Sequence, residues 1–204
     1  MSRYRGPVTR LSRRLGVMLF TNGASKTKAF NKKPYKPGEH GQKRFSQVSE
    51  YNRQLQEKQK ARFMYNITEK QCRRYFEMAN KSTEVTGPQF MTLLELRLDN
   101  AVYKAGFALT RQQARQIVNH GLVKLNGKRA TIASMVVKVG DVIEIREKSK
   151  TSKLFEELKT AKYKAPKWLN VDAKTLKCEV VSLPDQDDIE QIIDSQLIVE
   201  YYSK

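Results

Sequence analysis

One stretch of the sequence, residues 108–129, collects side chains that are able to do chemistry. It reads ALTRQQARQIVNHGLVKLNGKR and holds five Arg or Lys, no acid and one of the two histidines. To act as a general base, His120 would need a substrate pocket and usually an orienting carboxylate. The nearest acids along the chain are Asp99 and Asp141. The sequence therefore favours a structural or phosphate-contacting role for His120 over a catalytic one.

The arginines of the same stretch indicate binding to anions. Arg111 and Arg115 are one helical turn apart, so they project from one face of a helix, and guanidinium forks bind phosphates bidentately. The alternative, a basic face that contacts only solvent, would carry compensating acids, and none lies between Asp99 and Asp141. We predict an anion-binding surface made of Arg111, Gln112, Arg115, Asn119, His120, Lys124, Lys128 and Arg129.

Other kinds of reactive site find little support in the residue types. The chain has two cysteines, Cys72 and Cys178, and two histidines, His40 and His120, too few for a metal-binding cluster. Cys72 shares helical spacing with Tyr75, which predicts a buried thiol. The sequence also lacks a glycine-rich phosphate loop and a nucleophile signature. We predict no metal, no cofactor and no enzymatic activity.

The charge of the chain indicates a polyanionic partner. Its 39 Lys and Arg against 21 Asp and Glu give +18 at pH 7, an excess that is typical of proteins that bind polyanions. Residues 1–60 hold 15 basic and 3 acidic side chains, whereas residues 151–204 hold 8 and 10. No apolar run approaches the ~20 residues of a membrane-spanning helix. Nucleic acid and an anionic membrane surface are the two candidate partners.

Residues 1–44 form a basic segment with Gly and Pro throughout and one acid, Glu39. Such a segment cannot form long regular elements or bury enough surface to order itself alone. It fits a disordered tail or an arm that folds on polyphosphate, and composition leaves these two open. A targeting peptide is a third alternative, but Gly and Pro would interrupt its amphipathic helix.

Helical periodicity dominates the middle of the chain. We expect a helical hairpin over residues 46–81 and a third helix over residues 90–105 that ends at Gly106. A fourth helix would begin at Thr110, a good N-cap residue, and stop at Gly121. The helix over residues 90–105 and the helix that begins at Thr110 directly precede the predicted strands.

The period then changes from helix to strand. Residues 123–125 alternate between apolar and polar side chains, Asn126–Gly127 is a strong hairpin signal, and residues 135–147 alternate again. Residues 90–147 therefore predict two short helices packed on a small antiparallel sheet. The fold class expected for the chain is α+β.

The C-terminal part, residues 148–204, differs by its excess of acids. A strand is expected at residues 178–184, and Asp187 or Asp188 is expected to cap a short helix through Ile193. The acids make this part a poor phosphate binder. We expect it to pack back on the helices of residues 46–81 and to close their core.

A resemblance to a known family accounts for these features. The segment LLELRLDNAVYKAGFALTRQQARQIVNHGLVKLNGKRATIASMVVKVGDVIEIRE, residues 93–147, resembles the S-four RNA-binding module. Along nearly the whole length, the chain is similar to the small-subunit ribosomal protein S-four family. The segments that carry this likeness are MSRYRGP, RRLG, KPYKPGEHGQKR, SEYNRQLQEKQKARFMYNITEKQCRRYF and QLIVEYYSK. A match that begins at Met1 argues against a removable targeting peptide.

The resemblance implies a function in the small ribosomal subunit, in the cytoplasm or in an organelle. The family binds small-subunit ribosomal RNA at a multi-helix junction early in assembly and contacts neighbouring ribosomal proteins. It later lines the channel through which messenger RNA enters and influences decoding accuracy. Neither a membrane nor a small-molecule substrate is implied. Many relatives bind zinc through a cysteine cluster in the arm, but this arm has no cysteine, so no metal is expected.

The resemblance also implies a domain organisation and a set of RNA ligands. The expected parts are an arm at 1–44, a helical domain at 45–89 that is completed by 150–204, and an inserted module at 90–149. The expected ligands are Arg3, Arg5, Arg10, Arg13, Arg14, Lys43 and Arg44 in the arm; Arg53, Lys58 and Arg73 in the helical domain; and Arg111, Gln112, Arg115, Asn119, His120, Lys128 and Arg129 in the module.

Two rival interpretations of the sequence compete with a ribosomal role. The tripeptide RLD at residues 97–99 resembles the catalytic-aspartate segment of pseudouridine synthases, but only 57 residues follow residue 147, too few for their catalytic domain. A free-standing regulatory RNA binder that carries the module is the other rival. The long basic arm and the acidic C-terminal part favour the ribosome.

Overall fold

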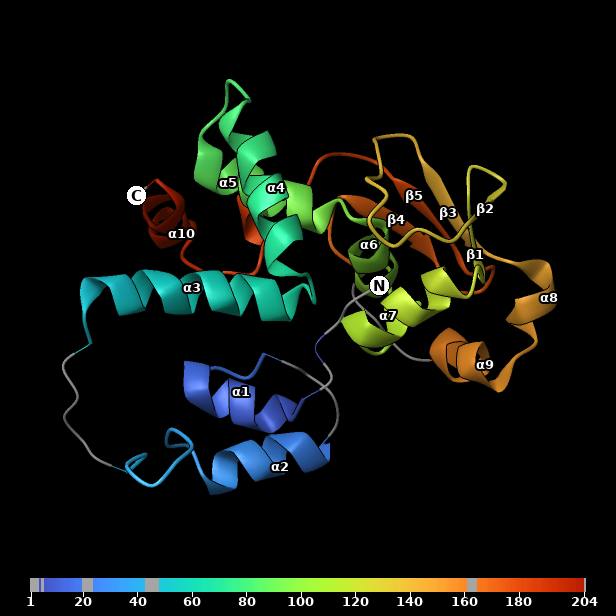
Figure 1. Ribbon diagram of the computed structural model, residues 1–204. Coiled ribbons are helices and arrows are strands. Elements are labelled where there is room, and N and C mark those ends of the chain that lie inside the picture. Colours follow the sequence, from blue (N-terminus) through green and yellow to red (C-terminus); the bar gives the residue numbers. More distant parts are fainter. Residues whose placement is uncertain (1–3, 5, 20–23, 43–47, 161–164, 204) are drawn as a thin grey trace. The chain divides into compact units, whose positions relative to one another are not determined.

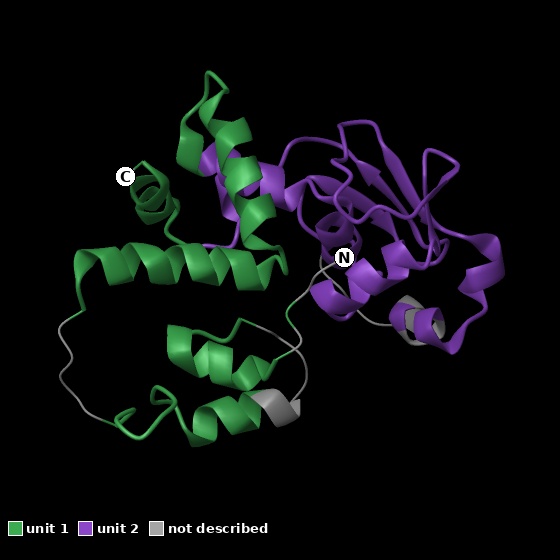
Figure 2. Ribbon diagram, in the orientation of Figure 1, with its two compact units in different colours: residues 1–87, 192–204 green, residues 88–191 purple. Residues whose placement is uncertain are grey.

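The computed structural model describes residues 4, 6–19, 24–42, 48–160 and 165–203 (Figure 1). The chain forms two compact units, one of residues 1–87 with 192–204 and the other of residues 88–191 (Figure 2). The chain thus leaves the first unit, builds the second and returns with its last residues. Four of the predicted RNA ligands lie outside the described residues: Arg3, Arg5, Lys43 and Arg44.

The first unit is helical in its described part. Its helices are α1 (Val8–Leu15), α2 (Ala24–Lys32), α3 (Glu50–Met64), α4 (Glu69–Asn80) and α10 (Ser195–Tyr202). The C-terminal α10 lies beside α3 (Figure 1), and Tyr202 stacks on Phe76 of α4 with ring centroids 4.8 Å apart. Cys72 and Ile198 are fully buried. The expected closure of the helical core by the C-terminal end is therefore made by α10.

Short helices occupy part of the basic arm. The helix α1 ends at Gly16, whose φ of 71° is the left-handed conformation that glycine adopts without strain. Leu11 and Leu15 are buried. Arg13 donates a hydrogen bond from Nε to the carbonyl of Tyr35 at 3.0 Å and lies over the Tyr35 ring at 5.0 Å. This arginine therefore ties α1 to the segment that follows α2.

The second unit is a five-stranded antiparallel sheet with helices on it. Its strands run in the order β2-β1-β3-β5-β4. They are β1 (Val123–Leu125), β2 (Lys128–Ala130), β3 (Val142–Ile145), β4 (Leu169–Asp172) and β5 (Lys177–Val180), and the helices are α6 (Leu98–Lys104), α7 (Arg111–Asn119), α8 (Glu147–Lys150) and α9 (Lys153–Thr160). Apolar side chains of α6, α7 and the strands share one buried core, with Val102, Ile117 and Ile143 among its members. The α+β class is confirmed.

The predicted single helix over residues 90–105 is wrong. The structure has α5 (Thr86–Glu95), which joins the two units, and then α6. Between them the chain is extended at Arg97, with φ −68° and ψ 138°. The amide of Leu98 donates to the carbonyl of Met135 at 2.8 Å, and the amide of Val137 donates to the carbonyl of Leu96 at 2.9 Å. Backbone pairing with a distant segment thus replaces one helical turn.

The C-terminal part is divided differently from the expected organisation. Residues 150–204 were expected to complete the helical domain, but residues 150–191 belong to the second unit and only residues 192–204 return. The physical reason is the open edge of β3, whose backbone groups need partners. β5 supplies them, with Val142 opposite Glu179. A 3₁₀ turn, η1 (Gln186–Asp188), stands near the place of the short helix expected through Ile193.

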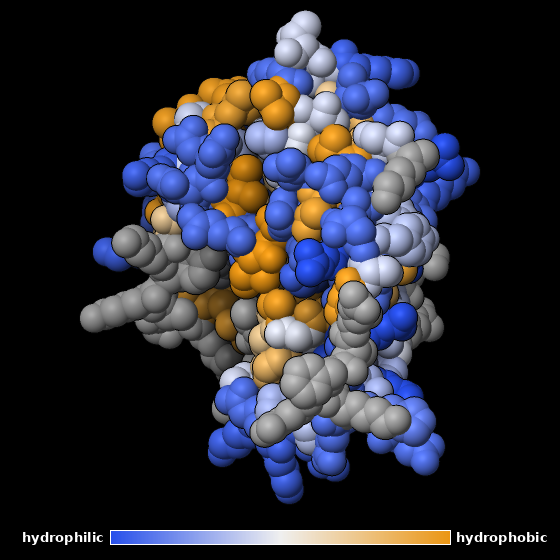
Figure 3. Space-filling view, turned by 90° about the vertical axis from the view of Figure 1, so that its left-hand side faces the viewer, coloured by the Kyte–Doolittle hydropathy of each residue, from blue (hydrophilic) through white to orange (hydrophobic). Residues whose placement is uncertain are grey.

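The surface of the described residues is mixed in polarity. No helix among them is both long and apolar enough to cross a membrane. On the face shown in Figure 3, hydrophobic side chains come to the surface between many hydrophilic ones.

Candidate nucleic-acid interface

Arg115 lies inside the second unit rather than on its surface. Its residue is 3% exposed, and its Nη1 is 3.5 Å from Asp99 Oδ2. Arg97 Nη2 binds the same carboxylate oxygen at 2.8 Å. The first turn of α6 brings this carboxylate against α7, and a buried guanidinium needs such a partner. The prediction that Arg115 projects from an exposed face is therefore wrong.

Arg111 is largely enclosed by polar partners. Its Nε donates to Asn100 Oδ1 at 2.8 Å, its Nη2 donates to Glu190 Oε1 at 2.7 Å, and its guanidinium lies 4.7 Å from the Tyr103 ring centroid. The side chain is 13% exposed. Little of the guanidinium fork is left for a phosphate, so the expected Arg111–Arg115 pair does not form a surface.

An acidic segment before the unit boundary covers this part of the module. Lys104 Nζ lies 3.5 Å from Glu190 Oε1 and donates to the carbonyl of Asp188 at 3.3 Å. Burial disfavours the charged form of Glu190, but the charges of Arg111 and Lys104 outweigh it and lower the pKa of this carboxyl. Glu190 thus places a negative charge next to the predicted phosphate site.

Polar and basic side chains, all of them exposed except the half-buried Arg146, gather at the other end of α7. Arg129 Nη2 donates to the carbonyl of His120 at 3.3 Å, and Arg146 Nη1 donates to the carbonyl of Gly121 at 3.3 Å. Cations favourably meet the free carbonyls at the end of a helix. We call this group the α7-end surface. It consists of Asn119, His120, Lys128, Arg129 and Arg146.

The hairpin of β1 and β2 positions two of the five residues of the α7-end surface. Asn126 and Gly127 have φ of 50° and 76°, as a type I′ turn requires, so the predicted hairpin is confirmed. The turn brings Lys128 and Arg129 directly after it, and both are exposed. Arg146 was missed from sequence because its contact with Gly121 spans 25 positions and no local pattern announces it.

Two other residues of the predicted surface, Gln112 and Lys124, lie outside the α7-end surface. Gln112 is half-buried on α7. Lys124 Nζ lies 3.4 Å from Glu144 Oε1 on the neighbouring strand β3. Part of its charge is therefore neutralised within the sheet.

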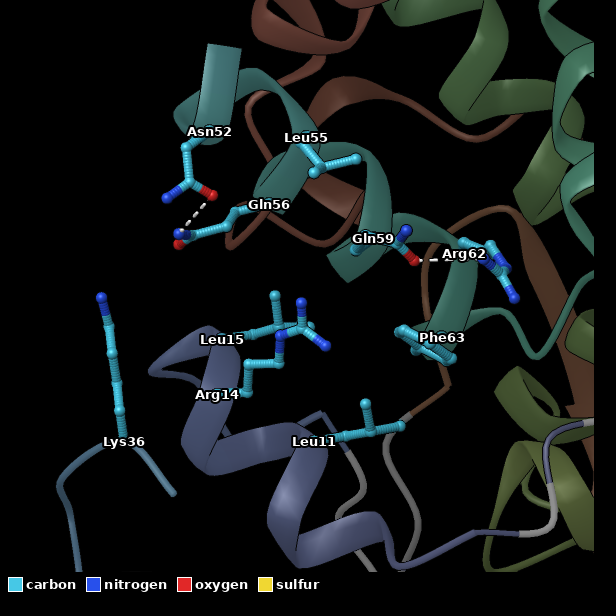
Figure 4. Close-up of a pocket in the computed structure, with 10 residues that line it drawn as sticks. All are labelled: Leu11, Arg14, Leu15, Lys36, Asn52, Leu55, Gln56, Gln59, Arg62 and Phe63. Atoms are coloured by element: carbon cyan, nitrogen blue, oxygen red, sulfur yellow. Dashed lines mark hydrogen bonds between the residues drawn. The ribbon is translucent and has the colours of Figure 1, made fainter. Parts of the chain in front are cut away.

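In the first unit, exposed arginines of α1 border a cavity. Arg10 and Arg14 are exposed, as is Lys36. Arg14 and Lys36 line a cavity of about 290 Å³ between α1 and α3, which we call the α1–α3 cavity (Figure 4). Lys36 was not singled out from the sequence, since it is one of many cations in the arm.

Of the other predicted ligands in this unit, Lys58 is buried and Arg53 and Arg73 are exposed. Lys58 Nζ lies 2.9 Å from Glu69 Oε2 and 4.8 Å from the Tyr201 ring centroid. Lys58 therefore holds α3, α4 and α10 together, and its predicted place on an RNA-binding surface is wrong. In the described part of the chain, Arg53 and Arg73 pair with acids on their own helices, and both stay predicted ligands.

The two thiols are buried. Burial raises the pKa of Cys72 to about 11 and that of Cys178 to about 12, so both are protonated near neutral pH and unsuited to nucleophilic chemistry. Within the part of the chain that the structure describes, no three His, Cys, Asp or Glu side chains are grouped to hold a metal ion.

The second unit packs a helix pair on a small antiparallel sheet and carries cations at one end. The chain as a whole is strongly basic. Together these features define a nucleic-acid-binding protein of the α+β class. Residues 3–95 match the family model "Ribosomal protein S4/S9 N-terminal domain". Residues 96–143 match the model "S4 domain", which is the S-four module.

Full-length relatives give the same result. The chain is 50% identical to the small ribosomal subunit protein uS4 of Caldicellulosiruptor saccharolyticus. It is 48% identical to the protein of that name from Pediococcus pentosaceus and 46% identical to that of Chloroflexus aurantiacus. Each alignment covers 100% of both chains. The chain belongs to the ribosomal protein S4 family, so the resemblance found in the sequence is confirmed.

Proposed function

We propose that this chain is a structural protein of the small ribosomal subunit that binds ribosomal RNA and is not an enzyme. The observation that carries the proposal is the end-to-end alignment at 46–50% identity with proteins named small ribosomal subunit protein uS4. The charge of +18 supports it, because RNA phosphates would neutralise the excess.

The α7-end surface, the arginines of α1, and Arg53 and Arg73 are the RNA-binding residues that we propose from the described part of the chain. RNA double helices hide their base edges in a deep groove, so proteins contact mainly phosphates and 2′-hydroxyls. Arg10, Arg14 and Arg129 are exposed and present guanidinium groups for such contacts. Arg3, Arg5, Lys43 and Arg44 belong to the same proposal as residues of the arm.

The finer function is proposed on the same basis. We infer that the protein binds at a multi-helix RNA junction early in assembly, contacts neighbouring ribosomal proteins, and later borders the channel through which messenger RNA enters and affects decoding accuracy. Two compact units that each carry exposed cations support binding to more than one RNA helix. The site of action would be the small ribosomal subunit in the cytoplasm or in an organelle.

The salt dependence of RNA binding tests the proposal. If about ten phosphates are contacted, the affinity for small-subunit RNA falls by roughly 10³–10⁵ between 50 and 200 mM salt. Filter binding over a salt series measures the slope. A slope near zero contradicts the proposal.

Single substitutions test the proposed surface. Lys128→Gln and Arg129→Gln should each reduce the salt slope by about one contact. Lys174→Gln is the matched control, since Lys174 is exposed in the turn between β4 and β5 and is not part of the proposed surface. Equal slopes in all three variants would remove the α7-end surface from the interface.

Sedimentation tests the cellular assignment. Tagged protein should migrate with small ribosomal subunits. Its accumulation only in the light fractions would favour a free-standing RNA binder.

A further inference from the structure

We propose that the α1–α3 cavity binds a single unstacked nucleotide of the ribosomal RNA. The inference rests on the proposed function and adds a base-specific site to a protein that otherwise contacts the RNA backbone. It is drawn from the lining of the cavity, which combines apolar, amide and cationic side chains (Figure 4).

The apolar part of the lining comes from both helices. Leu11 and Leu15 of α1 point toward α3, and Phe63 lies at one end of the cavity (Figure 4). Tyr4 packs edge-on against Phe63 with ring centroids 5.3 Å apart. Single-stranded RNA bases are held by aromatic and apolar side chains on their faces. The cavity therefore offers a base the apolar contact that it loses when it leaves the stack.

The amide part of the lining comes from α3. Gln56 Nε2 donates to Asn52 Oδ1 at 3.1 Å, an arrangement that fixes the orientation of both amides. Within the described residues, the other two atoms, Gln56 Oε1 and Asn52 Nδ2, make no hydrogen bond. One is an acceptor and the other a donor. Such a pair matches the edge of a nucleobase, and Asn and Gln side chains bind adenine in particular.

The charged part of the lining is entirely basic. Arg14, Lys36 and Arg62 contribute cations, and no acid is among the residues that line the cavity. Arg14 and Lys36 are exposed at the mouth, where the phosphates on either side of an inserted base would lie. This distribution favours a nucleotide, whose phosphate supplies the compensating negative charge, over a peptide segment without acidic side chains.

The dimensions exclude larger occupants. A volume of about 290 Å³ is at the small end of the range for ligand pockets, roughly 300–1,000 Å³. A double helix is far too wide to enter it. One nucleotide from a loop, bulge or junction is the part of a folded RNA that fits.

Removal of one amide tests the inference. We expect Gln56→Leu, in the full-length protein, to reduce the affinity for small-subunit RNA about tenfold, the effect of one lost base contact. It should also abolish the protection of one unpaired base, an adenine by the amide chemistry, from dimethyl sulfate. Gln196→Leu is the matched control, because Gln196 is an exposed glutamine on a helix of the same unit, and it should change neither measurement.

The outcomes separate this inference from the proposed function. If the wild-type protein fails to bind the RNA, both are overturned. If it binds, and Gln56→Leu keeps its affinity within twofold and all base protections, only the nucleotide site is overturned. Unchanged protections with weaker incorporation into small subunits would mean that the cavity takes a protein segment, which also overturns it. Thermal unfolding monitors folding, and Asn52→Leu replaces Gln56→Leu if that variant unfolds, with the same outcomes.

Discussion

The guanidinium of Arg111 donates a 2.7 Å hydrogen bond to the carboxylate of Glu190, 79 positions later in the chain. The sequence between Asp99 and Asp141 has no acid, yet the folded module places two carboxylates against its arginines. Glu190 pairs with Arg111, and Asp99 pairs with Arg115. Of the five cations in residues 108–129, only Lys128 and Arg129 are therefore exposed, and both belong to the α7-end surface.

Loss of the Glu190 carboxylate should weaken the second unit. Glu190→Gln removes the carboxylate charge that Arg111 and Lys104 share, and we expect the free energy of unfolding at pH 7 to fall by about 1–2 kcal/mol, between the values for exposed and buried ion pairs. Urea unfolding measures the change. Glu147→Gln is the control, since Glu147 is exposed and its ion pair is with Lys150 on the same short helix, α8.

The same pair predicts a pH dependence. The folded-state pKa of Glu190 is lowered from its ordinary value of 4.5, so its contribution to stability is present above pH 4.5 and is lost as the pH falls through the lowered folded-state pKa. Wild-type protein and Glu190→Gln should differ at pH 7 and converge in strong acid. Thermal unfolding from pH 7 to pH 3 checks this, and a constant difference across the range would contradict it.

The buried pair of Arg115 and Asp99 should act on stability rather than on RNA contact. Arg115→Gln leaves the Asp99 carboxylate with one guanidinium fewer, and breaking a buried pair costs roughly 3–5 kcal/mol. Urea unfolding should show this loss, whereas Arg53→Gln, at an exposed arginine of α3, should leave stability unchanged. A fully stable Arg115→Gln with weaker RNA binding would show that Arg115 is a direct ligand after all.

Lys58 gives a parallel prediction for the first unit. Lys58→Met keeps the length of the side chain but removes the ammonium that binds Glu69, which also accepts a hydrogen bond from the Tyr202 hydroxyl at 2.9 Å. We expect a loss of about 1–3 kcal/mol in unfolding free energy. The salt slope of RNA binding, measured on the folded variant, should equal that of the wild-type protein.

Two glycines with similar backbones should separate strain from RNA contact. Gly121 and Gly127 have φ of 66° and 76°, so alanine costs roughly 1 kcal/mol of stability at either position. A Cβ at Gly121 would also collide with the Arg129 guanidinium, whereas a Cβ at Gly127 would meet nothing. Gly121→Ala should therefore weaken RNA binding more than Gly127→Ala. Equal affinities for the two variants would mean that the position of Arg129 is irrelevant to binding.

The sequence by itself determined what depends on neighbours along the chain. The start of α7 at Thr110, whose hydroxyl accepts from the amide of Gln113, and the Asn126–Gly127 turn follow from local hydrogen bonding and backbone preference. The polyanionic partner follows from net charge, and the family follows from ordered segments along the chain.

Only the tertiary structure decided which charged groups reach the surface. In sequence, Arg115 and Lys58 look like surface cations, but both are buried in the fold. Asp99 pairs with Arg115 and Glu69 pairs with Lys58, because a buried cation is stable only beside a carboxylate. The tertiary structure likewise decided the extent of the sheet, because the open edge of β3 pairs with β5, a strand from the C-terminal part of the chain. Helical spacing fixes the direction of a side chain on its own helix, whereas its burial depends on partners that the fold brings from distant positions.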